Sequence, residues 1–474
     1  MTNDEYFKSQ EFKDILHVYE KGKQEGVSIY LDPNDLADIA EYYHLQGQID
    51  KSVALIDEAI NLFPGSSAPL IFRARIELLV NNDPFKAEEF AEQVEDKTDL
   101  EYHYLKTEIM LVRHQDREAD RFLLDCLGTI DESDREDFYI DVATLFADYD
   151  LIDKAHEWLM RSQLQDSDNY QELTGRIALA KGDYMQSQHI FNDLVEKNPY
   201  SGSYWNHLAS SQYMSNEIRE SITSSEFSIA INPNDDEAIL NKANGLFALG
   251  NYEEALLYYK RLTDMCPKEE TGEMFQGITF IKLNRLKEAV EHLKQAEEIA
   301  GRDSETLPDI YQTLAYTFSS LGESQQAMAY IKKAEQALGA NLNELSVLRG
   351  HLLMGQGEVE RARESYQKAI YDSDFDPDII LRAAISIYEN NYIELAYGFL
   401  HTLLGIGETG RTDGYSYLAA CCKELGKDSE YKKALKKACE RNPVEVRAVL
   451  GENIPSTLDP SEYYHYLIEH TDKQ

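Results

Sequence analysis

The sequence predicts an all-α chain built by repeating one antiparallel pair of helices. Three observations lead to this expectation: prolines recur at a fixed interval, small residues recur at the same interval, and apolar residues follow helical spacing on both sides of a turn. The chain has 474 residues, more than a single hydrophobic core usually organises, so it must divide into several cores or grow by repetition. The regular intervals favour repetition.

The interval is 34 residues, and it separates Pro199 from Pro233 and Pro233 from Pro267. Small residues keep the same interval in two series. The first series is Gly175, Ala209, Ala243 and Gly277, and the second is Ser187, Ser221, Ala255 and Ala289, resuming at Ala327, Ala362 and Ala396. Two helices approach most closely where one side chain is small, so these positions mark the places where helices cross.

The unit at residues 238–261 shows how each pair is made. Its first apolar stripe consists of Leu240, Ala243, Leu246 and Phe247, and its second of Ala255, Leu256 and Tyr259. Gly250 lies between the stripes and suits the left-handed end of a helix, while Pro267 stops the second helix. Each unit is therefore expected to be a helix hairpin.

This pattern resembles the tetratricopeptide repeat, a helix-turn-helix of 34 residues with small and aromatic residues at set positions and a closing proline. Residues 236–267 match the family pattern best, and the preceding unit supplies its tryptophan at Trp205, with Leu208 and Ala209 in phase. Extending the phase gives about twelve repeats over most of the chain. The resemblance implies a right-handed superhelical solenoid of stacked antiparallel helix hairpins.

The expected organisation has five parts. They are an N-terminal capping helix at residues 1–34, divergent repeats at 35–165, well-preserved repeats at 166–300, C-terminal repeats at 301–443 and C-terminal capping helices at 444–474. Caps are expected because a solenoid otherwise exposes an apolar face at each end. The apolar residues from Phe7 to Tyr19 suit the first cap. The tyrosine cluster from Tyr463 to Tyr466 either closes the other end or docks a partner or a second copy.

Acidic residues dominate the composition, with 86 acids against 46 bases and a formal net charge of −40. This balance argues against binding to nucleic acids or anionic membranes, which need a basic surface. The one basic concentration, at residues 423–441, is interleaved with acids and is interpreted as a solvated helix face. We find no signal-peptide pattern and no apolar run long enough to span a membrane, so we expect a cytoplasmic protein.

Several motifs resemble catalytic or metal sites but are interpreted as structural. The glycines from Gly405 to Gly410 have the spacing of a dinucleotide-binding loop, yet they follow a helix where a strand is required. The aspartates from Asp148 to Asp153 lack the other ligands of a calcium loop. Histidines form no paired ligand spacing, and the five cysteines, including Cys421 and Cys422, are expected to pack as reduced thiols. We therefore expect no enzyme activity, metal or cofactor.

The resemblance also implies where binding would occur, because first helices of such hairpins line the concave side of the solenoid. In the phase of the strict repeats, the inward positions are Glu172, Arg176, Asn206, Ser210, Tyr213, Leu240, Asn244, Phe247, Met274, Ile278, Gln312 and Tyr316. Amide side chains can form hydrogen bonds with a peptide backbone, and aromatic side chains provide a large contact area. The prediction is a scaffold or adaptor that binds a neutral or basic protein or peptide, with homo-oligomers possible. The alternatives are a peptide or small-molecule sensor that uses the same groove and, less favoured, an enzyme.

Overall fold

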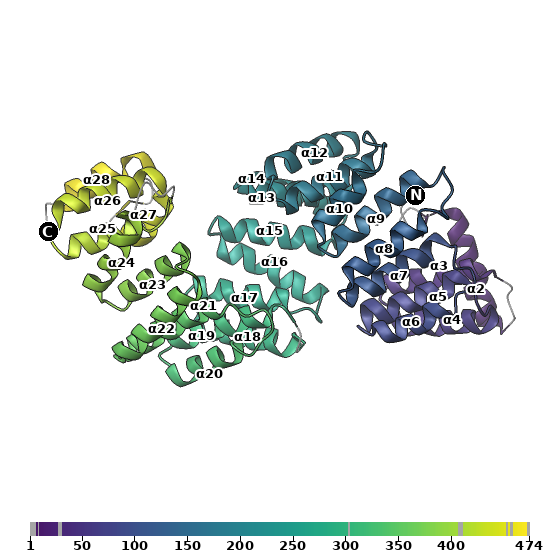
Figure 1. Cartoon of the computed structure of the whole chain (residues 1–474), viewed down its shortest axis with the longest axis horizontal. Helices are drawn as coiled ribbons and strands as arrows, with labels where there is room; N and C mark the ends of the chain where they lie inside the picture. Colours follow the sequence, from purple (N-terminus) through teal and green to yellow (C-terminus); the bar gives the residue numbers. More distant parts are fainter. Residues whose placement is uncertain are drawn as a thin grey trace. The chain divides into compact units, whose positions relative to one another are not determined.

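The computed structural model describes residues 6–7, 9–26, 31–301, 304–405, 411–451, 454–455 and 458–471. Within these residues every regular element is a helix and none is a strand. The chain divides into two compact units, unit 1 at Met1–Ile231 and unit 2 at Asn232–Gln474. Each unit is described by itself, and Figure 1 labels the helices of both.

Unit 1 is a stack of helix pairs in which consecutive helices pack side by side. Its helices are α2 (Gln10–Glu25), α3 (Pro33–Leu45), α4 (Ile49–Leu62), α5 (Ser67–Arg75), η1 (Ile76–Val80), α6 (Pro84–Glu92), α7 (Leu100–Val112), α8 (Asp116–Cys126), α9 (Arg135–Asp148), α10 (Ile152–Leu159), α11 (Asp168–Ala180), α12 (Tyr184–Lys197), α13 (Gly202–Met214) and α14 (Ile218–Ile231). The odd-numbered helices from α3 to α13 are the first members of the pairs.

Unit 2 has the same construction. Its helices are α15 (Asp236–Ala248), α16 (Tyr252–Met265), α17 (Thr271–Lys282), α18 (Leu286–Ile299), α19 (Leu307–Ser320), α20 (Ser324–Ala334), α21 (Leu342–Gly355), α22 (Val359–Asp372), α23 (Pro377–Glu389), α24 (Ile393–Gly405), α25 (Tyr415–Glu424), α26 (Asp428–Arg441), α27 (Pro443–Leu450), η3 (Pro460–Glu462) and α28 (Tyr463–Thr471). The predicted all-α fold of stacked helix hairpins is therefore confirmed within each unit.

A residue with a positive φ angle marks the turn of every hairpin in the described residues. These turn residues are Gly47, Asn82, His114, Asp150, Gly182, Asn216, Gly250, Asn284, Gly322, Gly357, Asn391 and Gly426. The next residue closes the turn by donating its N–H to a carbonyl of the first helix, as Asn251 does to Leu246 at 2.9 Å. This is a Schellman ending. The twelve turns confirm the predicted number of repeats.

The small residues lie where the two helices of a pair cross, as expected from their spacing. A methyl group added at Gly175 would lie 2.7 Å from the ring of Phe191, and one added at Gly277 would lie 2.6 Å from Leu293. Ala209 is fully buried in the same role. Any larger side chain at these positions would push the helices apart.

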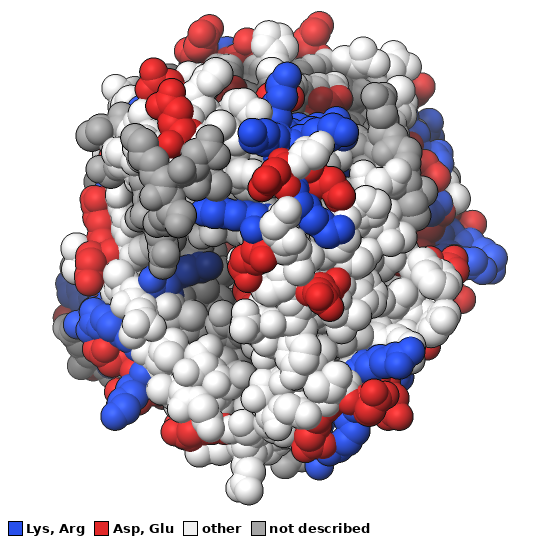
Figure 2. Space-filling model, turned by 90° about the vertical axis from the view of Figure 1, so that its left-hand side faces the viewer, with Lys and Arg blue, Asp and Glu red and all other residues white. Residues whose placement is uncertain are grey.

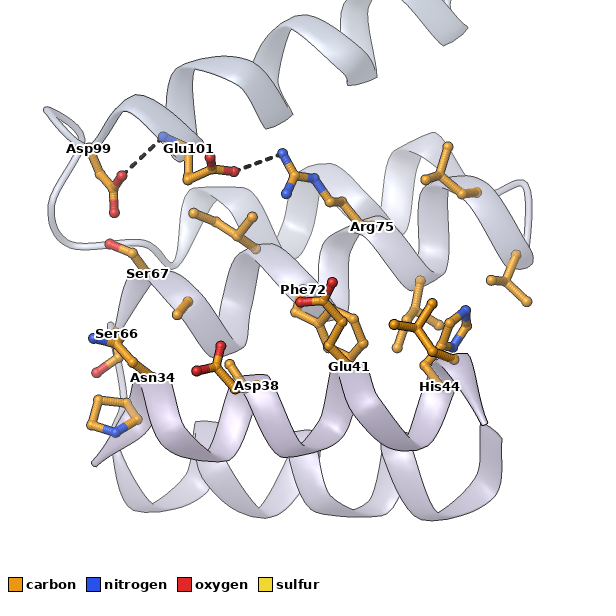
Figure 3. Close-up of a pocket in the computed structure, with 18 residues that line it drawn as sticks. Asn34, Asp38, Glu41, His44, Ser66, Ser67, Phe72, Arg75, Asp99 and Glu101 are labelled. Atoms are coloured by element: carbon orange, nitrogen blue, oxygen red, sulfur yellow. Dashed lines mark hydrogen bonds and ion pairs between the residues drawn. The ribbon is translucent and has the colours of Figure 1, made fainter. Parts of the chain in front are cut away.

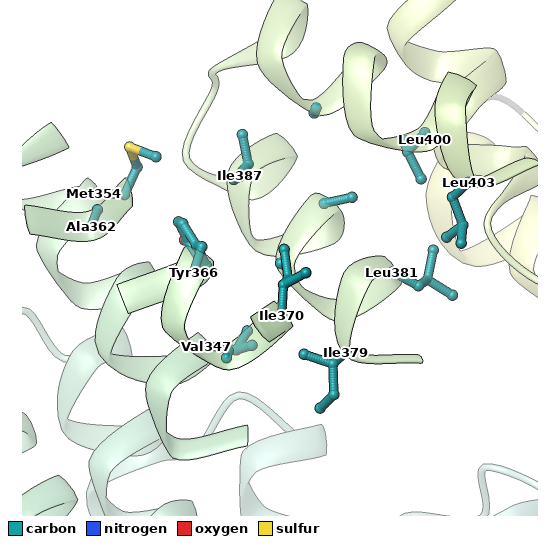
Figure 4. Close-up of a cluster of buried hydrophobic side chains, with 14 of the residues drawn as sticks. Val347, Met354, Ala362, Tyr366, Ile370, Ile379, Leu381, Ile387, Leu400 and Leu403 are labelled. Atoms are coloured by element: carbon teal, nitrogen blue, oxygen red, sulfur yellow. The ribbon is translucent and has the colours of Figure 1, made fainter. Parts of the chain in front are cut away.

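The hydrophobic core consists of clusters, each formed by side chains of neighbouring helix pairs. Figure 4 shows this in unit 2, where side chains of α21 to α24 meet around Tyr366 and Leu400. Cys421 and Cys422 are fully buried on α25, so the predicted packing of this pair into the core is confirmed. In unit 1 the corresponding core is richer in large rings and includes the fully buried Trp158.

The end helices also pack by their apolar sides. On α2, Phe12 is almost completely buried in a cluster formed with α3 and α4. On α28, Tyr463 and Leu467 are buried in a cluster with α25 and α26.

One repeat of unit 1 is longer than the others. The small residues of a hairpin are 12 residues apart in most repeats, as in Ala243 and Ala255, but Ala74 and Ala87 are 13 apart. The extra residue is accommodated in η1, a turn of π-helix that continues α5. A single inserted residue in a helix typically produces such a turn. This insertion is one reason why the repeat pattern is hard to recognise before residue 166.

Candidate functional site

Two grooves lie on the first-helix surfaces, one in each unit. The N-terminal groove is a cavity of about 760 Å³ lined by α3, α5, η1 and the start of α7. The C-terminal groove is a cavity of about 360 Å³ lined by α19, α21 and α23. Each is thus formed by first helices of three consecutive repeats. Both volumes lie within the range that is typical of ligand-binding clefts.

Carboxylates flank the N-terminal groove on two sides. Figure 3 shows Asp38 and Glu41 on α3, with Asp99 and Glu101 near the start of α7 on the opposite side. The only Lys or Arg among the residues that line the groove is Arg75. Four carboxylates against one guanidinium make this groove strongly acidic.

Arg75 is held by two carboxylates of α7. Its Nη2 lies 3.0 Å from Glu101 Oε2 and 3.1 Å from Glu108 Oε1, and its Nε donates to Glu108 Oε2 at 3.2 Å. Burial tends to lower the pKa of Arg75, but these two carboxylates raise it overall. The guanidinium therefore links α5 to α7 as a permanent charge.

The Asp38 carboxyl is harder to ionise than an ordinary aspartate. Burial is the main cause of its raised pKa, and the nearby charges of Asp35 and Asp32 raise it further. A hydrogen bond with Tyr6 acts in the opposite direction. The groove therefore holds a partly desolvated carboxyl that has no basic residue among the causes of its shift.

The floor and one wall of the N-terminal groove are apolar. Ile71 and Phe72 line it from α5, which packs against both α3 and α7. Leu79 and Val80 of η1 are 64% and 52% exposed, so the edge of the groove carries apolar surface that faces the solvent. An occupant of the groove would cover this surface.

The C-terminal groove is more balanced in charge. Glu344 pairs with Arg382 at 2.9 Å and also accepts a hydrogen bond from Gln312 at 3.3 Å, so the three first helices are linked across the groove. Val347 and Ile385 contribute apolar surface between the polar groups.

His351 is the centre of a polar network at one side of the C-terminal groove. Its Nδ1 lies 3.1 Å from Ser386 Oγ and 3.1 Å from the amide nitrogen of Asn390, which can only donate. Nδ1 is therefore an acceptor, and the ring proton is on Nε2. Burial lowers the pKa of His351 and raises that of the neighbouring Glu389. The neutral ring can thus donate an N–H to an occupant.

The predicted inward residues have different surroundings. Gln312 and Tyr316 line the C-terminal groove, and Tyr316 is 44% exposed. Asn206 and Met274 are buried. Asn244 accepts a hydrogen bond from Tyr259 of its own hairpin at 2.8 Å.

The remaining predicted residues are half-buried. Glu172 accepts a hydrogen bond from Ser203 at 3.3 Å, and Arg176 pairs with Asp148. Phe247 contacts the ring of Tyr252. The others in this half-buried set are Ser210, Tyr213, Leu240 and Ile278. None of the twelve lies in the N-terminal groove, which the sequence interpretation missed.

The motifs interpreted as structural have the following surroundings. Asp148 pairs with Arg176, and Asp153 lies 3.1 Å from Lys181. Of the glycine-rich motif, residues 406–410 lie outside the described residues. All five cysteines are free thiols. Among the described residues we find no group of three or more His, Cys, Asp or Glu side chains arranged to hold a metal ion.

The basic concentration near the C-terminus does not form a continuous basic surface. On the side of the molecule drawn in Figure 2, Lys and Arg side chains are interspersed with Asp and Glu. On and next to α26, Lys427 lies 4.0 Å from Glu430, and Lys436 lies 3.9 Å from Glu440. The mixed charges agree with a solvated helix face.

No helix in the described part of the chain combines the length and the apolar character that crossing a membrane requires.

Comparison with known proteins identifies the repeats. Sequence models of the tetratricopeptide repeat match residues 240–304, 308–337 and 344–371. Over 198 residues the chain is 25% identical to the protein CTR9 homolog of Arabidopsis thaliana, a stretch that covers 39% of this chain and 18% of that protein. The match therefore spans less than a fifth of that relative.

Several solved structures are similar at low scores. One chain in the structure of the APC/C hetero-tetramer Cut9-Hcn1 is 14% identical in sequence to this chain. The two align with a TM-score of 0.42 over 96% of this chain and 95% of that chain. PilW, a widely conserved type IV pilus biogenesis factor, is 17% identical, with a TM-score of 0.41 over 45% of this chain and 96% of its own. These scores support no inference about function. The matched repeats in unit 2 show that the chain contains tetratricopeptide repeats, and the twelve hairpin turns support a tetratricopeptide-repeat protein.

Proposed function

We propose that the chain is a non-catalytic scaffold that holds segments of partner proteins in its first-helix grooves. The observation that carries this proposal is the presence of a groove in each unit, formed in both cases by first helices of three consecutive repeats. A surface of this kind is extended along the stack, so it fits a chain segment better than a compact ligand. We further propose a cytoplasmic location and a partner that is neutral or basic.

The C-terminal groove has the groups that an extended peptide requires. Gln312 offers an amide, Tyr316 an exposed phenol and His351 a ring N–H, and these groups can pair with backbone carbonyl and N–H groups. Val347 and Ile385 add apolar contact area. Because the polar groups are aligned along three helices, they suit backbone recognition with little demand on sequence.

A sensor of a small molecule is the second candidate, and the C-terminal groove favours it. At about 360 Å³ this cavity is large enough for a small ligand, and Arg382, His351 and Glu389 converge on it. A titration of the intact protein with small metabolites would separate this function from the scaffold.

Site-specific crosslinking tests the scaffold. A photo-crosslinking amino acid at Leu79 of the N-terminal groove or at Tyr316 of the C-terminal groove should trap partner proteins in cells. The same group at Leu257, a 67% exposed residue on second helix α16, serves as the control. Peptides from the trapped partners should bind the purified full chain and compete with crosslinking. Equal capture at Leu257, or trapped proteins whose peptides do not bind, would contradict the proposal.

A further inference from the structure

We propose that the N-terminal groove binds a segment of a partner protein in which lysine or arginine side chains lie beside an aliphatic side chain. This inference rests on the proposed function and adds the chemistry of one ligand. The charge and the shape of this groove both favour a basic partner segment.

The charge of the groove selects a cation. The lining carries four carboxylates, from Asp38, Glu41, Asp99 and Glu101, and a single guanidinium. That guanidinium is bound by Glu101, one of the four, and by Glu108 of α7, so the lining as a whole stays negatively charged. An incoming ammonium or guanidinium group would therefore be attracted, and an acidic segment would be repelled on both sides.

Partial burial strengthens this selection. Asp38 is a half-buried carboxyl beside other acids, and its pKa is raised mainly by burial. Charge interactions are stronger where water is partly excluded. A cation next to Asp38 would relieve the repulsion from Asp35 and Asp32, so binding should favour the ionised carboxylate.

The π-turn supplies the apolar half of the site. It presents Leu79 and Val80 outward at the edge of the cavity, and both are more than half exposed. Among the described helices, this π-turn lines the N-terminal groove and not the C-terminal groove. Turns of π-helix are often found at functional sites. Covering the pair with an aliphatic side chain would remove apolar surface from water.

The π-turn is held rigidly from behind. Glu77 is 1% exposed, and its carboxylate accepts hydrogen bonds from Lys86 at 2.7 Å and from Asn81 at 2.9 Å. Arg73 pairs with the same carboxylate at 2.5 Å. The exposure of Leu79 and Val80 is therefore a fixed feature of the fold, and an apolar contact there requires little ordering.

Short synthetic peptides test the proposal on the full chain. Three peptides share one sequence in which leucine alternates with lysine, glutamine or glutamate, and fluorescence anisotropy measures their dissociation constants. The lysine peptide should bind at least about tenfold more tightly than the glutamine peptide, and the glutamate peptide should bind most weakly. Raising the salt concentration should weaken the lysine peptide most.

Matched variants locate the binding. Asp38→Asn with Glu41→Gln removes two groove charges at nearly constant shape and should weaken the lysine peptide about tenfold. Glu89→Gln with Glu118→Gln removes the same charge from exposed positions on second helices of unit 1 and should leave binding unchanged. Leu79→Ser should weaken all three peptides by a similar factor. Circular dichroism checks that each variant folds.

Each other outcome overturns the proposal. Equal binding of the three peptides, or equal losses in the groove and control variants, would show that the groove does not select a basic segment. If partners are trapped at Tyr316 while no peptide binds at Leu79, the scaffold function stands and this inference fails. Self-association that the Asp38→Asn and Glu41→Gln variant abolishes, measured by light scattering, would show that the occupant is a second copy.

Discussion

The N-terminal and C-terminal grooves are made by the same construction and differ in their chemistry. In both, first helices of three repeats form the walls. The N-terminal groove has four carboxylates, one of them the half-buried Asp38, and an exposed π-turn. The C-terminal groove balances Arg382 and a neutral His351 against Glu344 and Glu389. The hairpin needs only its small crossing residues and its turn, so the outward residues of first helices are free to differ. Ligand chemistry can therefore change from groove to groove without change of fold.

The two units also differ in their cores, and this makes them separately measurable. The chain has two tryptophans, Trp158 and Trp205, and both lie in unit 1. Tryptophan fluorescence therefore reports on unit 1 alone, while circular dichroism reports on helices of both units.

The largest effect is expected from Trp158→Ala. This side chain is fully buried among the rings of unit 1, and its indole N–H donates to Asp120 at 2.8 Å. Removing it should lower the free energy of unfolding of unit 1 by about 4 kcal/mol. Denaturant unfolding followed by the fluorescence of Trp205 measures the loss. Trp158→Phe is the control, which keeps most of the packing. A loss below about 1 kcal/mol for the alanine variant would show that the core of unit 1 does not depend on this ring.

A pH dependence of unit 1 is expected from His207. Burial, and to a smaller extent the charge of Arg176, lowers the pKa of His207 to about 4. The centre of its ring lies 4.9 Å from that of Phe191. Because the unfolded chain binds this proton near pH 6.5, stability is full above that pH and falls as pH decreases toward 4. The loss should be on the order of 2 kcal/mol. His207→Gln should remove this part of the pH dependence. Identical fluorescence-detected pH profiles of the two proteins would contradict the prediction.

The crossing glycines should give matched effects in the two units. Gly175→Ala places a methyl group against the ring of Phe191 in unit 1, and Gly277→Ala places one against Leu293 in unit 2. Each should destabilise its unit by about 1 to 2 kcal/mol. Gly398→Ala is the control, since nothing lies within 4 Å of the added methyl group. That change should instead stabilise α24 by about 1 kcal/mol. If Gly277→Ala lowers the fluorescence-detected unfolding midpoint as much as Gly175→Ala does, the two units unfold together.

The smallest effects are expected where arginines link first helices. Arg75→Gln breaks the link from α5 to α7, which involves the mostly buried Glu108, and should cost about 1 kcal/mol. Arg382→Gln breaks a more exposed pair in unit 2 and should cost less than about 0.5 kcal/mol. Thermal unfolding at low and high salt measures both losses of stability. The loss caused by Arg382→Gln should disappear at a lower salt concentration than the loss caused by Arg75→Gln. A larger loss for Arg382→Gln would reverse the comparison.

The sequence predicted the fold, and its predicted inward residues include two that line the C-terminal groove and none that lines the N-terminal groove. The spacing of small residues identified the crossings at Gly175 and Gly277, because the geometry of two packed helices allows nothing larger there. Gly250 was correctly expected at a left-handed turn. The same turn in other repeats is occupied by His114 or Asp150, and because non-glycine residues are uncommon at positive φ, residue type alone did not predict these turns.

The sequence by itself determined the repeat, because each hairpin depends on contacts within a few tens of residues. The predicted inward residues divided into buried ones such as Met274 and exposed ones such as Tyr316, because exposure depends on the neighbouring helices as well as on the periodicity of the helix itself. Only the tertiary structure revealed that one inserted residue becomes a π-turn and that Asp38 and Glu101 face one groove from separate repeats. Packing between repeats brings these groups together, and no interval along the chain records it.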